Sequence, residues 1–438
     1  LGAILWTQRA DALLGCPPEV PPQKITRTSE TEGTGTPWVF FEQDDSVRQP
    51  YHKFDGDDVT LAASATSGTV TLTASAEVFE PDHVGQRFRL VLKEVEIATV
   101  VSATEATATV KQTLSQTAAT KDWDEQAFSA VRGWPVSVAF HQDRMVVGGS
   151  RDLPNRLWLS RSADLFNFNQ GEGEDDEAIE FAILSDQVNA VRAVFSGRHL
   201  QFFTSGAEWI VTGDPLTPTN IQLPRQTRVV SPVDRSVPPR DVYGATLFLS
   251  RNGRELREFL FADVEQAYQA NDLAILAKHI LNSPIDQDYD QRERLMHLVM
   301  GDGTLGTVTI FRAEQVTAWT MQSTMGEFRS VAVVGDDVYV LVERSNGHFI
   351  EVFDAGLQTD AALRGTSAEP TAVWSGLDHL NGETVNVVGD GIVRSDKLVA
   401  AGSVTLDQPA SSVQIGLRFA HEIEPLPVVA GSPTGPAQ

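Results

Sequence analysis

A run of acidic residues is the most conspicuous group of side chains in this sequence that could do chemistry. It reads Glu172-Gly173-Glu174-Asp175-Asp176-Glu177, and carboxylate oxygens are ligands that Ca²⁺ prefers. The run lacks the ligand spacing and the glycine position of an EF-hand loop, however. A solvated acidic loop is therefore favoured over a metal site. A second acidic stretch, Asp286-Gln287-Asp288-Tyr289-Asp290, is a weaker candidate.

Motifs of the common enzyme classes are missing. The sequence contains no phosphate-binding loop, no GxGxxG after a strand, no HExxH and no G-x-S-x-G. Single histidines such as His141 and His199 fall in expected turns and are interpreted as solvated surface groups. Cys16 is the only cysteine, which excludes an internal disulfide and cysteine-built metal sites. We therefore expect no catalytic, cofactor-binding or metal-binding residues and no cofactor.

The net charge argues against ordinary binding of nucleic acid. The chain of 438 residues carries 34 basic and 59 acidic residues, a net charge of −25. Conventional DNA binding needs clustered Lys and Arg that neutralise phosphates, and the densest basic stretch, residues 225–240, is spaced out by Pro and Asp. An acidic surface usually serves solubility, but it would also let DNA slide past without being held. No apolar run approaches the ~20 residues that span a bilayer, so no membrane-spanning segment is expected.

The elements that must position these residues are β-strands. Apolar and polar residues alternate in the stretches 69–73, 88–92 and 106–110, which is typical of half-buried strands. These stretches are rich in Thr, Ala and Val and are bordered by polar segments. They predict a small β-barrel within residues 51–130, preceded by an N-terminal segment, residues 1–50, that contributes some strands to the body.

Residues 131–365 show a loose repeat of hairpins. Each hairpin has two apolar strands around a turn that contains Gly, Asn or Asp, and the turns lie at 141–144, 196–199, 251–253, 301–303 and 335–337. The spacing of roughly 35–55 residues is that of a propeller blade. Large aromatic residues recur in the hairpins, at Trp158, Trp209, Trp319 and Phe349. They are interpreted as packing between sheets.

Two further features complete the organisation. Residues 263–277 are the best candidate for a helix, with Leu273, Leu276 and Ile280 at helical spacing. A Pro- and Ser-containing segment, residues 366–370, marks a boundary before a C-terminal β-domain, residues 366–438, whose last residues 431–438 read as a flexible tail. The expected fold is all-β: an irregular β-propeller-like body, a small inserted β-barrel and a C-terminal β-domain.

Several blocks of this sequence resemble one family of phage tail proteins. The first blocks are Gly133-Trp134-Pro135, Phe140-His141-Gln142-Asp143-Arg144-Met145-Val146-Val147-Gly148-Gly149-Ser150 and Asn155-Arg156-Leu157-Trp158-Leu159-Ser160-Arg161-Ser162. Further blocks are Asp186-Gln187-Val188-Asn189-Ala190, Phe203-Thr204-Ser205-Gly206-Ala207-Glu208-Trp209, Leu216-Thr217-Pro218-Thr219-Asn220 and Gly376-Leu377-Asp378-His379-Leu380-Asn381-Gly382. Together they resemble the tail nozzle, or tail tubular protein B, of short-tailed bacteriophages, over about residues 131–425.

The resemblance implies a structural protein of the virion. In that family six copies form a β-rich tube below the adaptor ring, which retains the genome until ejection and offers docking surface to fibres or spikes. It implies a homohexamer whose lumen passes genomic DNA without sequence-specific binding, and it transfers no catalytic residues. The insert resembles a half-domain of ubiquitin-activating enzymes in fold only.

The position of the acidic run within such a tube is a hypothesis of its own. We expect Glu172, Glu174, Asp175, Asp176 and Glu177 to form an acidic loop that faces the lumen or its mouth, and a loop solvated on the outside is nearly as well supported. Two other functions stay open. A tail-borne glycan hydrolase would need paired carboxylates, whose spacing is set in space rather than in sequence, and a receptor-binding or fibre-docking module would need an exposed recognition surface.

Overall fold

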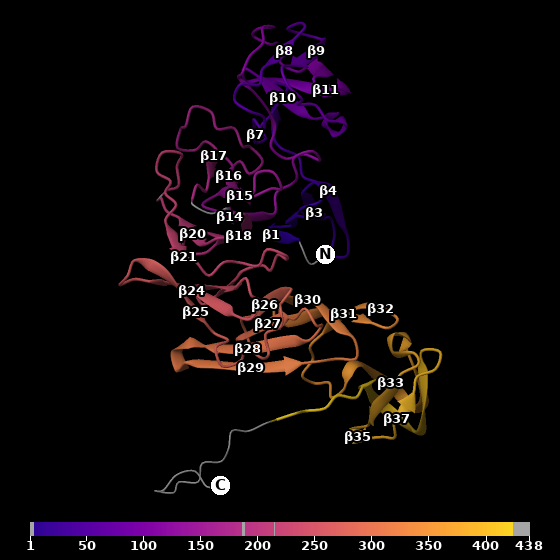
Figure 1. The fold of residues 1–438 in the computed structure, drawn as a ribbon. Helices are drawn as coiled ribbons and strands as arrows, with labels where there is room; N and C mark the ends of the chain where they lie inside the picture. Colours follow the sequence, from indigo (N-terminus) through magenta and orange to yellow (C-terminus); the bar gives the residue numbers. More distant parts are fainter. Residues whose placement is uncertain (1–3, 186–188, 214, 424–438) are drawn as a thin grey trace. The chain divides into compact units, whose positions relative to one another are not determined.

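A computed structural model describes residues 4–185, 189–213 and 215–423 of the chain (Figure 1). The expected fold class is confirmed: the protein is all-β, with a propeller-like body, a small inserted β-barrel and a C-terminal β-domain. In the described residues the only helices are three single 3₁₀ turns, η1 (Pro81–His83), η2 (Arg312–Glu314) and η3 (Asp378–Leu380). No described helix is long and apolar enough to cross a membrane.

The chain forms two compact units. The first comprises the residues up to Asp302 together with Gly306–Met321, and the second comprises Gly303–Leu305 and the residues from Gln322 onward. The sequence placed residues 322–365 with the body, whereas the chain packs them with the C-terminal β-domain. The reason is that long-range strand pairing, which decides such groupings, leaves little trace in local composition.

The N-terminal residues form a sheet of their own. Its order is β1-β2-β3-β4, and a separate two-stranded ladder joins β5 and β6. The strands are β1 (Leu5–Arg9), β2 (Ala12–Cys16), β3 (Gln23–Arg27), β4 (Gly33–Pro37), β5 (Glu42–Gln43) and β6 (Ser46–Val47). Leu14 and Cys16 are buried in a cluster with Trp38, Met145 and Trp158. The thiol of Cys16 is therefore a core group, and burial raises its pKa well above the ordinary value.

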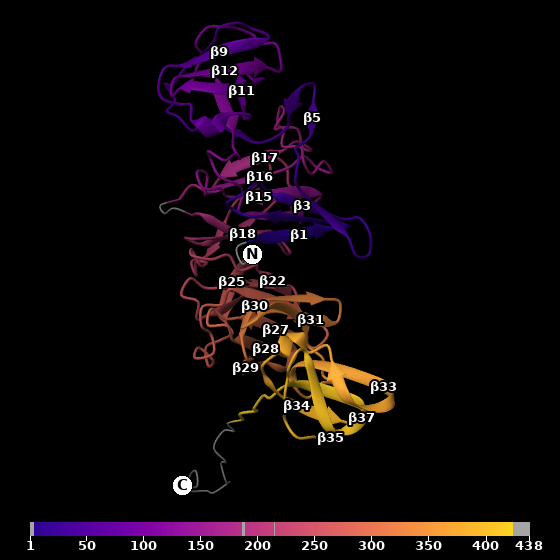
Figure 2. The same cartoon turned by 90° about the vertical axis from the view of Figure 1, so that its right-hand side faces the viewer.

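The insert, residues 51–130, contains one continuous sheet in the order β7-β13-β10-β11-β12-β9-β8 (Figure 2). The strands are β7 (Tyr51–His52), β8 (Leu61–Ala63), β9 (Thr69–Ala74), β10 (Arg87–Leu90), β11 (Lys93–Ser102), β12 (Glu105–Val110) and β13 (Trp123–Gln126). The alternation seen in the sequence is real: Val70 and Leu72 are buried, while Thr69 and Thr73 are exposed. A bridge between Leu61 and Thr120 brings the outer strand β8 back towards the end of the insert.

Four antiparallel four-stranded sheets follow in the first unit, each with its strands in chain order. The second sheet lies beside the first, where β18 packs against β14 and β15 (Figure 1). The first sheet contains β14 (Ser137–His141), β15 (Arg144–Gly148), β16 (Arg156–Leu159) and β17 (Ile179–Ala182). The second contains β18 (Val191–Ser196), β19 (Leu200–Thr204), β20 (Glu208–Val211) and β21 (Arg225–Thr227).

The third sheet contains β22 (Arg240–Val242), β23 (Ala245–Leu249), β24 (Leu256–Ala262) and β25 (Ala267–Asp272). The fourth contains β26 (Asp286–Asp290), β27 (Leu295–Val299), β28 (Leu305–Phe311) and β29 (Val316–Gln322). The predicted hairpin strands are thus present. The predicted role of the aromatic residues also holds for Trp158, Trp209 and Trp319, each of which lies in a hydrophobic cluster that joins neighbouring elements.

The helix expected over residues 263–277 is wrong. The chain there turns after the end of β24 and forms β25, with Tyr268 opposite Phe261 in an antiparallel pair. A helix would have buried Leu273, Leu276 and Ile280 on one face, but Leu276 is 92% exposed. Tyr268 instead stacks on Phe259 at 4.4 Å between ring centroids, and this pairing with the preceding strand overrides the local helical spacing.

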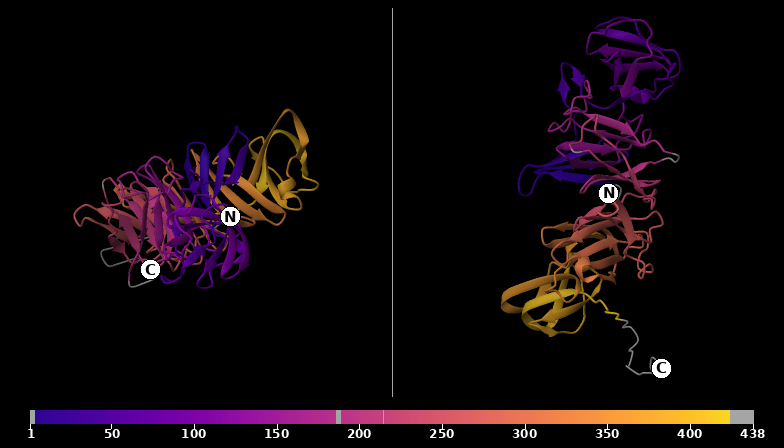
Figure 3. Two further views of the ribbon diagram at one scale, coloured as in Figure 1. Left: turned by 90° about the horizontal axis from the view of Figure 1, so that it is seen from above. Right: turned by 90° about the vertical axis from the view of Figure 1, so that its left-hand side faces the viewer.

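The second unit holds a three-stranded sheet, β30 (Glu327–Val334), β31 (Asp337–Arg344) and β32 (Gly347–Val352). It also holds the C-terminal sheet, which is coloured orange to yellow in Figure 3. The order of its strands is β33-β37-β34-β35, with β36 paired to β34. Its strands are β33 (Asp360–Ser375), β34 (Thr384–Gly389), β35 (Ile392–Val393), β36 (Lys397–Leu398) and β37 (Ser403–Leu417).

The boundary expected at residues 366–370 is also wrong, because this segment lies inside the long edge strand β33. The ladder between β33 and β37 is irregular between Thr366 and Thr371, so Pro370 falls where no regular pairing is required. Proline is tolerated at such bulges and on edge strands. The tail at 431–438 lies outside the described residues.

Candidate functional site: the acidic loop

The acidic run lies in the connection from β16 to β17 and is tied to the sheet by one arginine. The guanidinium of Arg144, at the start of β15, donates to the backbone carbonyls of Ser160 (2.7 Å), Glu177 (2.6 Å) and Asp175 (2.7 Å). Burial lowers the pKa of Arg144, but it remains a strong base in any ordinary buffer. Arg144 therefore fixes both ends of the β16–β17 connection to the sheet through backbone carbonyl groups.

Glu177 acts inside the loop rather than towards solvent. One of its carboxylate oxygens accepts the backbone N–H groups of Glu172 (2.7 Å), Gly173 (2.7 Å) and Glu174 (2.9 Å). These hydrogen bonds lower the pKa of Glu177, that from Glu174 most. Gly171 and Gly173 both have positive φ, which lets the chain curl around the carboxylate. A set of converging N–H groups of this kind binds anions, and here the chain supplies its own anion.

Asp176 is the second member of the run with a defined partner. Its carboxylate pairs with the guanidinium of Arg161 at 2.6 Å, and this hydrogen bond lowers the pKa of Asp176. The other three acidic residues, Glu172, Glu174 and Asp175, are exposed. The loop thus has two carboxylates that hold its shape and three that project negative charge into solvent. Whether that charge faces a lumen stays a prediction.

The arrangement does not suit a metal ion. Among residues 4–185, 189–213 and 215–423, no three His, Cys, Asp or Glu side chains are grouped so that they could hold one. The weaker acidic stretch, residues 286–290, forms strand β26. There Asp288 pairs with Arg240 at 2.7 Å, and Asp290 accepts the N–H groups of Arg292 and Glu293 in the following turn. Both aspartates therefore have structural contacts.

Sequence reasoning missed a buried ionic network at the base of the insert. Glu125, on β13, is fully buried. One carboxylate oxygen contacts the Nε2 of His83 at 2.9 Å, and the other accepts two hydrogen bonds from Arg132, at 2.6 and 3.1 Å. The backbone N–H of Glu80 donates to His83 Nδ1, so the neutral imidazole carries its proton on Nε2, towards Glu125. No local motif predicts this network, because its three members are separated along the chain.

A second missed feature is the carboxylate of Glu208, within one of the blocks of the phage resemblance. It is fully buried and accepts hydrogen bonds from the Thr227 hydroxyl (2.5 Å) and from the backbone N–H groups of Val229 (3.0 Å) and Val230 (2.7 Å). Burial raises the pKa of Glu208, against the effect of these hydrogen bonds. Glu208 thereby holds the chain that leaves β21. A glutamate in an otherwise apolar strand was the signal available in the sequence.

The interpretation of His141 and His199 as solvated surface groups is wrong. Both are half-buried, and burial lowers the pKa of each. His141 contacts the hydroxyl of Ser196 on the next sheet at 2.9 Å, and His199 contacts the Tyr268 hydroxyl at 3.1 Å. They link neighbouring sheets because hairpin turns at one end of the body lie against each other, which the sequence of a single hairpin does not reveal.

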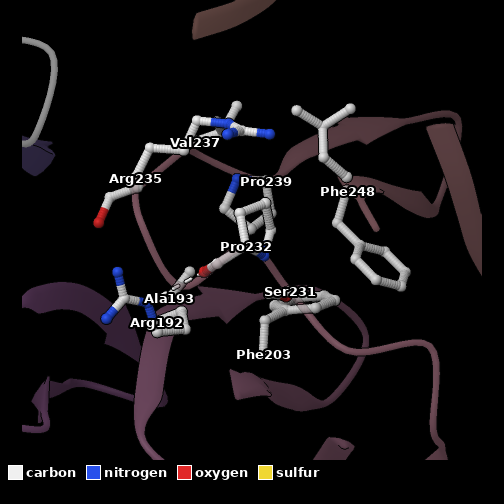
Figure 4. A pocket seen from close by; sticks show the side chains of 11 residues that line it. Arg192, Ala193, Phe203, Ser231, Pro232, Arg235, Val237, Pro239 and Phe248 are labelled. Atoms are coloured by element: carbon white, nitrogen blue, oxygen red, sulfur yellow. Dashed lines mark hydrogen bonds between the residues drawn. The ribbon is translucent and has the colours of Figure 1, made fainter. Parts of the chain in front are cut away.

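A shallow pocket lies between the second and third sheets of the first unit, with Arg192, Pro232, Arg235 and Phe248 in its lining (Figure 4). Its volume is about 280 Å³ with open solvent included. Arg192 donates to the carbonyls of Pro232 (3.1 Å) and Val233 (2.8 Å), and Arg235 donates to the carbonyl of Pro284 (2.8 Å). Both arginines thus support the proline-rich connection between the sheets.

Comparisons with known proteins give similarity of fold only. No protein-family model matches the sequence, and no curated protein matches it. Among solved structures, the chain is similar to Sqt1 from Saccharomyces cerevisiae (9% identity, 95% of each chain covered, TM-score 0.38). It is also similar to BamB from Moraxella catarrhalis (12% identity, 79% of this chain and 92% of that one, TM-score 0.34). A third is an auxiliary nutrient binding protein from Bacteroides thetaiotaomicron (8% identity, 83% and 99%, TM-score 0.31).

Proposed function

We propose that this chain is a structural protein of a bacteriophage tail. In this proposal it assembles as a homohexameric ring of the virion that conducts and retains DNA, below a tail adaptor, and offers docking surface to fibres or spikes. The proposal starts from the resemblance of residues 131–425 to tail nozzle proteins. It is supported by what the polar residues of the resembling blocks do.

Two of those polar residues, Arg144 and Glu208, bind backbone groups of this chain. Arg144 binds three carbonyls of the acidic loop and its flanks. Glu208 accepts hydrogen bonds from the hydroxyl of Thr227, at the end of β21, and from two N–H groups beyond this strand. An active site would instead turn titratable side chains towards a shared cavity. A structural protein needs side chains that hold its own backbone in place, and the resembling blocks contain such side chains. This observation carries the proposal.

The charge of the chain fits the passage of DNA. With a net charge of −25, the surface repels phosphates over the screening length of about 8 Å at physiological salt. Glu172, Glu174 and Asp175 are exposed on a loop whose backbone is held by Arg144 and Glu177. A rigid acidic loop at the wall of a channel would keep DNA from adhering to the wall. Because the loop itself would not move, it would not slow the passage of the DNA.

The first experiment determines the symmetry of the assembly. The purified chain and intact phage particles that contain it are imaged by electron microscopy, and the mass of the purified assembly is measured by native mass spectrometry. Six-fold rings at one end of the particle are the expected result. A monomer in intact particles, or binding and cleavage of a glycan by the isolated chain, would overturn the proposal.

The second experiment tests the acidic loop. Glu172→Lys, Glu174→Lys and Asp175→Lys are combined in one variant, which leaves Asp176 and Glu177 in their structural contacts. A control variant carries Glu30→Lys, Glu32→Lys and Glu77→Lys, which change the same charge at other exposed positions. If the loop faces DNA, the loop variant alone ejects DNA more slowly, and the rate recovers at high salt. Equal rates in both variants place the loop outside the DNA path.

A further inference from the structure

Four arginines that are far apart in the sequence meet at one end of the second and third sheets, and we call them the arginine cluster. Arg192 is on β18, and Arg235 is in the connection from β21 to β22. Arg251 and Arg254 are in the turn from β23 to β24. The backbone N–H of Arg251 donates to the carbonyl of Val230 at 2.7 Å, which joins this turn to the connection.

The connection from β21 to β22 brings the other members to the same place. Arg192 donates to the carbonyl of Pro232 in this connection at 3.1 Å. The guanidinium of Arg235 lies against the β23–β24 turn, where a Cβ added at Gly253 would stand 2.5 Å from its Nη2. Arg192 and Arg235 therefore line the shallow pocket of Figure 4, and the turn that carries the other two arginines adjoins it.

The chain itself neutralises little of the charge of the arginine cluster. Among the described residues, Asp234 is the one carboxylate that forms an ion pair with the cluster, at 2.9 Å from Nη1 of Arg235. Glu255 pairs with two basic residues outside the cluster. Arg251 and Arg254 are exposed. The cluster thus presents positive charge on a chain whose net charge is −25.

The pocket also keeps hydrogen-bond donors that no acceptor in the described part of the chain uses. They are Nη1 of Arg192, Nη2 of Arg235 and the hydroxyls of Ser231 and Ser236. Guanidinium and hydroxyl groups are donors that phosphate oxygens accept. The pocket has a volume of about 280 Å³ with open solvent included, which suits a single small anion better than an extended organic ligand.

The arginine cluster and the acidic loop lie at opposite ends of the strands. Ser196, the last residue of β18, contacts His141 in the turn before β15, at the end where Arg144 holds the acidic loop. Arg192 is four residues earlier on β18, a separation of about 13 Å along the strand. Charge is screened over about 8 Å at physiological salt, so the acidic loop does not cancel the attraction of an anion to the cluster.

We propose that the arginine cluster binds phosphate groups of the DNA backbone and is a point at which the DNA is held. This inference rests on the proposed function, which supplies DNA as the anion. Contacts to phosphates carry no sequence information, so the cluster holds any segment of a genome. Four arginines neutralise few phosphates, and the resulting affinity is low and depends strongly on salt. Such a contact retains DNA at rest and releases it during ejection.

The exposed pair in the β23–β24 turn allows a test that leaves the supports of the connection intact. The cluster variant combines Arg251→Gln and Arg254→Gln. The control variant combines Arg9→Gln and Arg418→Gln, which change the net charge equally at exposed positions without an ion pair among the described residues. Thermal unfolding checks that both full-length variants are folded. Binding of a short fluorescent DNA duplex is measured by anisotropy over a range of salt concentrations.

The wild type and the control variant are expected to bind the duplex with the same dependence on salt. In the cluster variant the affinity falls about tenfold, and the slope of log K against log salt becomes shallower by about two, because two phosphate contacts are lost. Equal binding by the two variants, or no binding by the wild type at low salt, would overturn the proposal.

Two competitors distinguish DNA from other anions. Inorganic phosphate is expected to displace the duplex only at millimolar concentrations, and displacement at micromolar concentrations would assign the site to free phosphate instead. Poly-glutamate that displaces the duplex as well as unlabelled DNA does would indicate an acidic protein partner and overturn the assignment to DNA. Six-fold rings that bind no DNA would overturn this inference alone, whereas the absence of rings would count against the proposed function.

Discussion

Glu125 and Arg132 form a two-point ion pair between the last strand of the insert and the segment that leads to β14. The guanidinium Nη2 and Nε lie 2.6 and 3.1 Å from the same carboxylate oxygen. The Glu125 side chain is fully buried, and that of Arg132 is 15% exposed. Because this buried pair joins β13 of the insert to the segment that leads to β14, it fixes the path of the chain from the insert into the body.

Arg132→Met is therefore expected to be strongly destabilising. It leaves the buried carboxylate of Glu125 with His83 as its remaining side-chain partner, and removing one partner of a buried pair costs about 3–5 kcal/mol. Chemical denaturation measures the free energy of unfolding. Arg27→Met is the control, because Arg27 and Asp11 form an exposed pair whose loss costs no more than about 1 kcal/mol. Equal losses in the two variants would contradict the role of the buried pair.

We predict that the insert can be removed without unfolding the body. The N–H of Ala127 donates to the carbonyl of Pro50 at 2.9 Å, so a short Gly-Ser turn can replace residues 51–126. The variant keeps Phe128, whose ring packs edge-on against Trp158 at 4.7 Å. We expect a cooperative thermal transition of the shortened chain. The same deletion with Phe128→Ala should lose about 3–5 kcal/mol more. A shortened chain with no cooperative transition would show that the insert is integral to the core.

The stability of the first unit should depend on pH through His52. Burial, and next the charge of Arg156, lower the pKa of His52 from 6.5 to about 4. As pH falls, the unfolded chain binds the proton first, so the contribution is intact above pH 6.5 and is lost as pH falls towards 4. His52→Gln should flatten the decline in unfolding free energy over this window. His279→Gln, at an exposed position, should leave the decline as it is in the wild type.

Glu208→Gln tests the carboxylate that holds the chain beyond β21. The amide keeps one acceptor oxygen but directs an N–H₂ group at a donor, so one buried hydrogen bond is lost. The expected cost is about 1–3 kcal/mol of unfolding free energy. Glu265→Gln lies on an exposed turn and should change stability by less than about 0.5 kcal/mol. If Glu208→Gln left the unfolding free energy unchanged, the amide would have to find an equivalent set of hydrogen-bond partners.

The strands and hairpin turns were determined by the sequence because they depend on near neighbours. Alternation of apolar residues and Thr in residues 69–73 suffices to specify β9, whose side chains face a core and solvent in turn. The turn at Gln142 and Asp143 has positive φ at both positions, as a tight hairpin requires. Repetition of such hairpins predicted a propeller-like body, and the acidic loop was found as a run of like charges.

Tertiary structure alone decided how the acidic loop is built and where local signals mislead. Glu177 and Asp176 look like Glu174 in sequence, but only the former two meet donors, from the loop backbone and from Arg161. Leu276 fits a helical pattern, yet pairing of β25 with β24 leaves it in solvent. In each case the deciding contact joins residues that the local pattern does not connect, and its free energy exceeds the small preference that one residue has for a helix or a turn. Sequence patterns therefore predicted most of the strands, whereas packing between strands decided the segment that forms β25 and which charges of the acidic loop are exposed.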